Sequence, residues 1–248
     1  MTQYSTGSMR HVSRTVTIGL GVVLLALLLL LIGYGAVSME MLRQETGFRM
    51  FLGGIALSLI ALAISLVGLW RARNPAERRR AVRSIIIALV IITPMSPHII
   101  AAFSVPPVHD ITTDTDNPPV FVAILPLRAD APNTSEYGGE SLAAAQKAGY
   151  PDLAPLILAV PAAEAFTRAQ KLVADRGWIL VEANAEEGRI EATAETRFMR
   201  FKDDVVIRIR PEGEGSRVDM RSVSRFGQSD LGVNARRISQ FLEDLKAS

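Results

Sequence analysis

The apolar and polar positions divide the 248-residue chain into two parts. Three stretches in the first part, residues 16–37, 50–70 and 84–105, contain no Asp, Glu, Lys or Arg. About 20 helical residues cross a bilayer core of about 30 Å, and a soluble helix of this length would show a polar face. The pattern therefore predicts three transmembrane helices.

Small residues and prolines add detail to these helices. In the second stretch small residues recur at spacings of four and three, which predicts a face that packs closely against another helix; they are Gly54, Ser58, Ala61, Ser65 and Gly68. In the third stretch, Pro94 and Pro97 predict a kink. His98 is expected to bond locally or reach interfacial water. A proton relay is the alternative, although no acid or lysine accompanies His98 in the spans.

Arginines predict the orientation of the helices. Residues 71–83, read as a loop, contain six arginines against Glu77 alone, whereas residues 38–49 balance two arginines with two glutamates. The positive-inside rule places residues 71–83 in the cytoplasm, together with Arg10, His11 and Arg14. The chain is thus expected to be a multi-pass protein of the cytoplasmic membrane, with an extracytoplasmic C-terminal domain. Specific binding of anionic lipid by the arginine loop is the alternative to a pure topology signal.

The first apolar stretch also resembles a secretory signal, because Arg10 and Arg14 precede it. Its length exceeds the roughly 7–15 apolar residues of a signal peptide, and "GAVS" is a poor cleavage site. We therefore expect an anchor that is retained.

The second part of the chain begins with a segment that has no apolar period. Residues 106–139 are rich in Pro, Asp and Thr, and we expect an extended connection with a strand-like piece at 120–125. A short helix is predicted at 140–147, a strand at 155–160, and an amphipathic helix at 162–176 that Gly177 ends. Strands with alternating apolar residues follow at 178–183, 189–199, 204–210 and 216–225, before a last helix at 234–246.

The alternation assigns residues to two faces of a sheet. The residues expected to face inward are Ile179, Val181, Ile190, Ala192, Ala194, Thr196, Phe198, Val205, Ile207, Ile209, Val218 and Met220. Because an apolar sheet face must be covered, we expect an antiparallel sheet of four to five strands with two helices on one face. The whole chain then reads as a tail (1–15), a membrane region (16–105), a connection (106–139) and an α+β domain (140–248).

The opposite sheet face is charged. Its residues are Arg189, Glu191, Glu195, Arg197, Arg208, Arg210, Arg217, Asp219, Arg221 and Arg225. A solvated lattice of ion pairs is the favoured interpretation, and a surface that meets an anionic partner is the alternative. The formal net charge of only +2 gives no reason to expect nucleic acid. The absence of cysteine excludes disulfides, thiolate metal sites and cysteine nucleophiles.

The stretch "RSVSRFGQSDLGVN" at residues 221–234 is the most suggestive corner. We expect Arg221 or Arg225 to pair with a nearby acid and so tie the last strand to the last helix; an anion pocket at the helix N-terminus is the alternative. Asp230 and Asn234 are candidate helix caps. The ligand-binding candidates are Arg221, Ser222, Ser224, Arg225, Asp230, Asn234, Arg237, Asp203, Asp204, His109 and Asp110.

Catalysis and metal binding have weaker support. A serine nucleophile at Ser222 or Ser224 would need His109 as its base, with Asp110 or Asp114 as the third member. A metal site would draw on His109, Asp110, Asp114 and Asp116, but the "DTDNPP" segment lacks the glycine and distal glutamate of a calcium loop. We therefore predict no catalytic residue, metal or cofactor.

Three separated motifs resemble a known family. "VHDITTDTDNPPVF", "GRIEATAETRFMRFKDDVVIRI" and "RSVSRFGQSDLGVNARRI" are similar to the bacterial family called domain of unknown function 1499, from about His109 to the C-terminus. The resemblance implies an envelope or lipoprotein-like protein and no particular activity. This chain departs from the lipoprotein-like form because it has no lipobox cysteine.

Three functions remain as hypotheses. The favoured one is a membrane-anchored domain that binds an envelope partner or ligand without catalysis. The second is an envelope enzyme that uses His109 or the Arg/Asp-rich corner. The third is a helix-grip-like lipid-binding domain, which would need an empty apolar cavity under the sheet.

Overall fold

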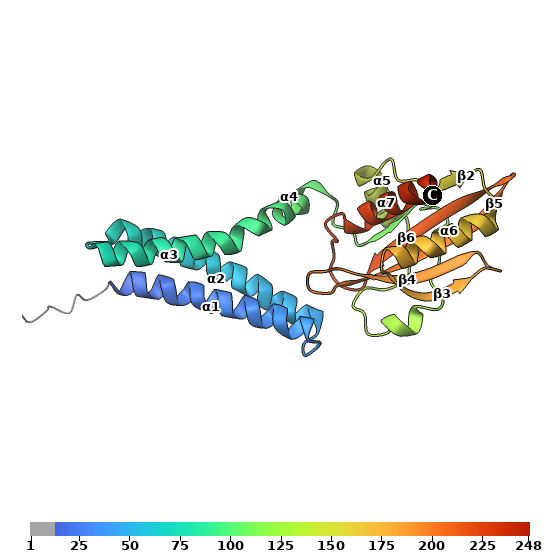
Figure 1. Cartoon of the computed structure of the whole chain (residues 1–248). Coiled ribbons are helices and arrows are strands. Elements are labelled where there is room, and N and C mark those ends of the chain that lie inside the picture. The colour runs from blue at the N-terminus through green and yellow to red at the C-terminus, as the bar shows by residue number, and fades with distance from the viewer. Residues whose placement is uncertain (1–12) are drawn as a thin grey trace, which may run out of the picture. The chain divides into compact units, whose positions relative to one another are not determined.

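The computed structural model describes residues 13–248, which form two compact units, residues 13–97 and 98–248 (Figure 1). Arg10 and His11 of the predicted tail lie outside the described residues. The first unit is helical, and the second contains the sheet.

Three long helices make up most of the first unit, as predicted. They are α1 (Arg14–Ser38), α2 (Gln44–Arg71) and α3 (Pro75–Ile92). Each is long and apolar enough to cross a membrane, the third as a span from Pro75 to His98. Leucines and isoleucines are exposed on all three helices, as expected for helices whose solvent is hydrocarbon.

The small-residue face predicted for α2 is confirmed as the packing face. Gly54, Ser58, Ala61, Ser65 and Gly68 are all buried. A Cβ added at Gly54 would lie 2.5 Å from Cγ of Leu30 on α1, and Ser65 Oγ donates to Ser84 Oγ of α3 at 2.7 Å. Close approach of backbones is what small residues permit in a membrane.

The predicted loop at residues 71–83 is largely helical, which corrects the sequence interpretation. Only three residues separate α2 from α3, and the α3 helix starts at Pro75. The side chain of Asn74 caps this helix by accepting the Glu77 N–H at 3.0 Å. An Asn cap followed by Pro at the first helical position is a strong start signal that outweighs the run of charges. The arginines therefore project from helical turns.

The third helix is interrupted where the prolines predicted a kink. A short 3₁₀ turn, η1 (Thr93–Met95), separates α3 from α4 (Ser96–Ser104). Pro94 lies in this turn and Pro97 in the first turn of α4. Proline lacks the N–H that would continue the α-helical ladder. The side chain of His98 in α4 is exposed.

In the second unit, six strands form one antiparallel sheet in the order β1-β6-β5-β4-β3, with β2 also paired to β6. The strands are β1 (Asp110–Thr112), β2 (Leu156–Leu158), β3 (Ile179–Asn184), β4 (Arg189–Glu195), β5 (Lys202–Glu212) and β6 (Gly215–Ser224). The helices are η2 (Leu125–Arg128), α5 (Gly139–Gly149), α6 (Ala162–Asp175) and α7 (Val233–Ala247). The predicted α+β class is confirmed, with β1 as an additional strand.

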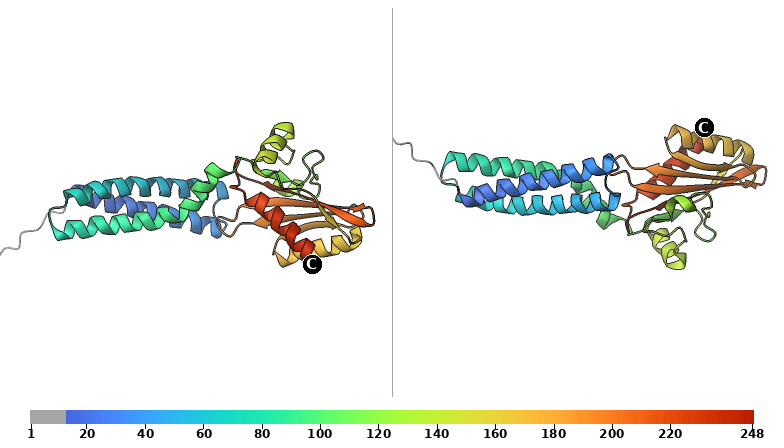
Figure 2. Two further views of the ribbon diagram at one scale, coloured as in Figure 1. Left: turned by 90° about the horizontal axis from the view of Figure 1, so that it is seen from above. Right: turned by 90° about the horizontal axis from the view of Figure 1, so that it is seen from below.

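One face of the sheet carries the main core, under α6 and α7 (Figures 1 and 2). Ile190, Ile207 and Met220 come from neighbouring strands and are fully buried. Ile238, Phe241 and Leu245 of α7 pack against them. The inward residues predicted for β5 and β6 are confirmed, and so are those predicted for β4 as far as Ala194. Each of these strands keeps a strict period of two.

The other face is covered by residues 113–137, which we call the covering loop (Figure 2). Phe121 and Ile124 of this loop pack on Val206 and Val223 in a second, smaller apolar cluster, which Val181 joins. The expected solvated lattice of ion pairs is therefore wrong, since Glu191, Asp219 and Arg221 on this face are buried.

Three local predictions are also wrong. Residues 120–125 form turns and not a strand. Strand β4 ends at Glu195, so Thr196 and Phe198 do not face the core. In β3 the register shifts between Leu180 and Glu182. Ile179 pairs with Thr193, so Ile179 and Val181 lie on the face of the covering loop, where Ile179 is exposed. The shift reverses the alternation beyond it, so Ala183 comes opposite Ile190 on the core face.

Candidate functional site

The sheet separates the predicted ligand-binding residues into two groups. Ser222, Ser224 and Asp203 lie on the face of α7, whereas Arg221 and Asp204 lie on the face of the covering loop, as the register of β5 and β6 requires. The single site that the sequence suggested is thus two clusters on opposite faces, each with its own partners.

On the α7 face, Asn234 is the centre of a closed hydrogen-bond network. Ser222 Oγ donates to Asn234 Oδ1 at 2.7 Å, and Asn234 Nδ2 donates to Ser224 Oγ and to the backbone oxygen of His109, both at 3.0 Å. Arg237 donates to Ser222 Oγ, to Asn234 Oδ1 and, at 2.6 Å, to Asp203. Asn234 is fully buried and does not cap the helix, contrary to the prediction. The network ties strand to helix.

Asp230 bonds the start of α7, although the N-cap residue is Gly232 and not Asp230 as predicted. Its carboxylate accepts the N–H of Asn234 at 2.5 Å and that of Gly232 at 2.8 Å. Burial raises the pKa of the Asp230 carboxyl, and these two N–H bonds oppose the shift. Gly227 has φ +94°, so a glycine is needed where the chain turns out of β6 toward the cap.

The parts of a serine-nucleophile site are not assembled around His109. The His109 ring lies 3.4 Å from the backbone oxygen of Gln228. Ser222 and Ser224 instead bond to Asn234, and Asp110 bonds to Arg221 on the other face. A general base must lie within hydrogen-bond reach of its nucleophile.

On the covering-loop face, Arg221 is a large charged side chain that is almost completely enclosed. Only 2% of the residue is exposed. Its guanidinium forms a bidentate pair with Asp110 of β1, at 2.9 and 2.7 Å. It lies between the rings of Phe121 and Tyr137, 5.2 and 5.4 Å from their centroids. Burial, with the charge of Asp110 as the next cause, raises the pKa of the Tyr137 phenol to about 12.

Arg221 also bonds the covering loop directly. It donates to the backbone oxygens of Pro119 at 3.2 Å and Ser135 at 2.9 Å. One side chain thus binds both ends of the loop. All of these partners are structural elements of the chain, so the guanidinium is occupied within the fold.

Arg225 and Arg128 share Asp204. Arg225 makes a bidentate pair with Asp204 at 2.9 and 2.8 Å, and Arg128 of η2 reaches the same carboxylate at 3.1 Å. Burial lowers the pKa of the Arg128 guanidinium, and the Asp204 carboxylate opposes that shift. The predicted pairing of Arg225 with an acid is confirmed, but it joins the end of β6 to the neighbouring strand β5 and not a strand to the helix.

Glu191 of β4 holds the middle of the covering loop. Its carboxylate accepts the backbone N–H groups of Val122, Ala123 and Ile124, at 2.9, 3.2 and 2.9 Å. Arg189 also donates to it. Glu191 is fully buried, so its charge is balanced by these donors instead of water.

A further charged cluster lies on the same face. Arg208, Arg210 and Arg217 surround Asp219, and Arg208 and Arg217 also reach Asp114. The acids weighed as metal ligands are therefore dispersed: Asp110 pairs with Arg221, Asp114 joins this cluster, and Asp116 contacts Lys147. Among residues 13–248, no three His, Asp or Glu side chains converge as a metal site would need.

The covering loop also exposes apolar side chains, which sequence reasoning missed. Phe121, Ile124 and Arg128 point inward, whereas Val120, Val122, Leu125 and Leu127 point outward and are 43–66% exposed. We call these four outward residues the apolar rim. The sequence signal for this arrangement is the spacing of three and four between the inward residues, which is typical of turns and helices. The sequence analysis interpreted this stretch as a strand instead.

The arrangement is suited to holding a loop in one conformation. Its buried charges are paired, and the apolar rim is one part of its exposed surface. Buried polar networks whose members all have partners specify a unique structure.

Comparison with known proteins adds the family. Residues 110–245 match the family model described as protein of unknown function (DUF1499). No curated protein matches the chain significantly. The matched region begins at β1 and ends in α7, and it includes Arg221, its partner Asp110 and the whole covering loop. The chain belongs to this family of proteins of unknown function.

Proposed function

We propose that residues 98–248 form a non-catalytic binding domain, anchored in the cytoplasmic membrane and facing the cell envelope, that binds a protein partner through the apolar rim. The observation that carries this proposal is the apolar rim itself. Contiguous exposed apolar side chains commonly mark interaction sites, and recognition residues are often on loops that a rigid scaffold positions. Here the scaffold contacts are the buried charges of Glu191, Asp204 and Arg221.

A protein partner fits better than a lipid surface. The covering loop contains four acids, Asp114, Asp116, Asp130 and Glu136, against the single basic residue Arg128, which is buried. Surfaces that bind anionic membranes carry clusters of basic residues. A lipid-carrier role has less support too, because the space between the sheet and α7 is filled by Ile238, Phe241 and Leu245.

The contacts of the two serine hydroxyl groups give no support to the enzyme hypothesis. Ser222 and Ser224 are engaged by Asn234, which is itself fully bonded. A nucleophile needs a base that removes its proton, and the His109 ring bonds elsewhere.

The test uses the absence of cysteine in the chain. Val122→Cys and Leu127→Cys, each carrying a photo-crosslinker, are expected to give one defined protein adduct in intact membranes. Gln170→Cys on the exposed face of α6 should give none. Adducts with lipid alone, or the same products from all three positions, would contradict a protein partner at the apolar rim.

A second comparison separates binding from folding. The double variant Val122→Ser, Leu127→Ser should abolish the adduct formed from Val120→Cys, while the melting temperature of the purified protein stays the same, because both side chains are exposed. Ile157→Ser removes an equally exposed apolar residue on β2 and should keep the adduct.

A further inference from the structure

The first turns of α3 carry positive charge without partners. Arg78, Arg79, Arg80 and Arg83 are exposed. Within residues 13–248 no acid pairs with them. The only acid nearby, Glu77, is buried and accepts the N–H groups of Ser13 at 3.0 Å and Arg73 at 2.8 Å. These arginines therefore remain free to bind an anion.

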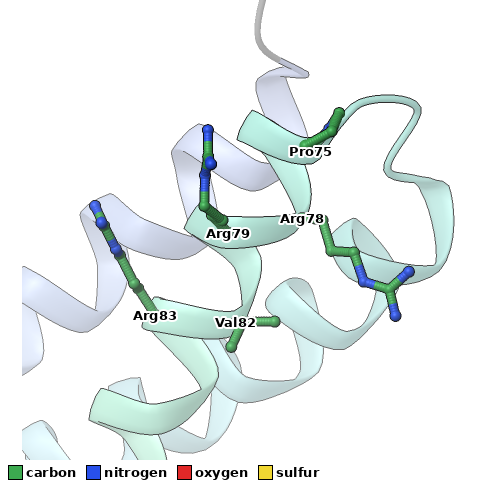
Figure 3. A pocket seen from close by; sticks show the side chains of 5 residues that line it. All are labelled: Pro75, Arg78, Arg79, Val82 and Arg83. Atoms are coloured by element: carbon green, nitrogen blue, oxygen red, sulfur yellow. The ribbon is translucent and has the colours of Figure 1, made fainter.

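Three of the arginines line an open depression on the surface of α3. Pro75, Arg78, Arg79, Val82 and Arg83 line a space of about 440 Å³, which we call the headgroup hollow (Figure 3). Arg79 and Arg83 extend side by side, one turn apart, and Arg78 lies on the other side of Val82 (Figure 3). Guanidinium groups present forked donors that match phosphate oxygens.

A second open depression, which we call the apolar groove, lies further along α3. Ile86, Leu89, Val90, Thr93 and Pro94 line it, with a volume of about 500 Å³. Val82, Ile86, Leu89 and Thr93 follow one another at spacings of four and three, so the hollow and the groove share one face of the helix. Ala81, Ser84 and Ala88 lie on the buried side that packs into the bundle.

The dimensions match one leaflet of a bilayer. From Val82 to Thr93 the helix rises about 16 Å at 1.5 Å per residue, and half of a hydrocarbon core of about 30 Å is about 15 Å. A ligand that fills both spaces carries a negative charge at one end and an apolar chain of about this length at the other.

We propose that this face of α3 is a binding site for an anionic phospholipid. The phosphate group lies in the headgroup hollow among Arg78, Arg79 and Arg83, and an acyl chain lies along the apolar groove. An anionic headgroup is selected, because the positive group of a zwitterionic headgroup would lie close to the three guanidinium groups and be repelled by them. A free phosphate ion would use the headgroup hollow alone.

The test is lipid binding to the full-length protein, purified in neutral detergent and measured by native mass spectrometry. Arg78→Gln, Arg79→Gln and Arg83→Gln together should weaken phosphatidylglycerol binding by at least about ten-fold, since each basic residue near an anionic surface contributes appreciably. Arg71→Gln, Arg73→Gln and Arg80→Gln together remove the same charge outside the hollow. This control should change binding by less than about two-fold. Equal losses in the two triple variants would show diffuse attraction and would overturn the site.

The apolar half is tested separately. Ile86→Ala with Leu89→Ala should weaken binding of phosphatidylglycerol but leave the direct binding of glycerol phosphate unchanged. If glycerol phosphate displaces the lipid at equal concentration, the ligand is a free phosphate and the lipid proposal fails. Phosphatidylcholine that binds as tightly as phosphatidylglycerol would also refute it. Each variant should keep its melting temperature in lipid-free detergent; if a triple variant does not, Arg79→Gln alone replaces it.

Discussion

At the scale of single residues, two arginines on one sheet face differ in their partners. Arg225 pairs with Asp204, which lies on the neighbouring strand and had been a candidate. Arg221 pairs with Asp110, which is 111 residues away in the sequence. Sequence reasoning ranked acids by proximity, and it could not know that a three-residue strand would bring Asp110 beside β6. The pairing of an arginine with an acid was predictable, but the partner of Arg221 was not.

The pairing of Arg221 with Asp110 predicts a large effect of removing the arginine. Arg221→Met should destabilise the full-length protein by about 3–5 kcal/mol, because it leaves the Asp110 carboxylate buried without its partner. For a domain of this size the melting temperature should fall by roughly 6–20 °C. Arg221→Lys should restore only part of the loss, since lysine cannot form the bidentate pair.

The control for this prediction is Arg197→Met, which removes the same charge from an exposed side chain. Thermal unfolding in detergent should show little change for this variant, because exposed charges contribute little. If Arg197→Met lowers the melting temperature as much as Arg221→Met does, the overall charge of the protein, and not the buried pair, stabilises the fold.

At the scale of elements, the regular parts were predictable and the covering loop was not. Ile190, Ile207 and Met220 each belong to a strand in which apolar residues recur with a period of two, as is typical of a half-buried strand. Strand β1 is too short to show any period. The covering loop is fixed by Glu191, Arg221 and Asp204, whose contacts run over 67–102 residues. Long-range contacts of this kind leave no local pattern in the sequence.

The packing face of α2 leads to a prediction for that helix. Gly54→Leu should destabilise the bundle by about 1–3 kcal/mol, because even a Cβ at this position would lie 2.5 Å from Leu30 and 3.1 Å from the backbone oxygen of Ala26. Gly21→Leu is the matched control, since a Cβ there meets nothing within 4 Å. Thermal unfolding in detergent measures both. A stable Gly54→Leu variant would show that α1 and α2 do not approach closely in the membrane.

At the scale of the whole molecule, the two units bury their polar groups in different ways. In residues 13–97 the seam between helices contains small residues and short hydroxyl contacts such as Ser65 to Ser84. In residues 98–248 the polar interior consists of charged pairs that fasten a loop to a sheet. The apolar stretches of the sequence run to residue 105, whereas the two compact units divide at residue 97. The contacts inside each unit follow different rules.

The same division leads to a prediction about topology. The exposed arginines of α3 lie at the start of the third span, and we expect this end of the span in the cytoplasm. The span then carries the chain across, so residues 98–248 are expected on the opposite side. Alkaline phosphatase fused after Ser248 should be active, and a fluorescent protein that folds only in the cytoplasm should stay dark at the same position. When fused after Ala72, between α2 and α3, alkaline phosphatase should be inactive and the fluorescent protein should be fluorescent. A fluorescent fusion after Ser248 would place the apolar rim in the cytoplasm and would contradict an envelope partner, whereas the anionic lipid site on α3 would then face the outer leaflet.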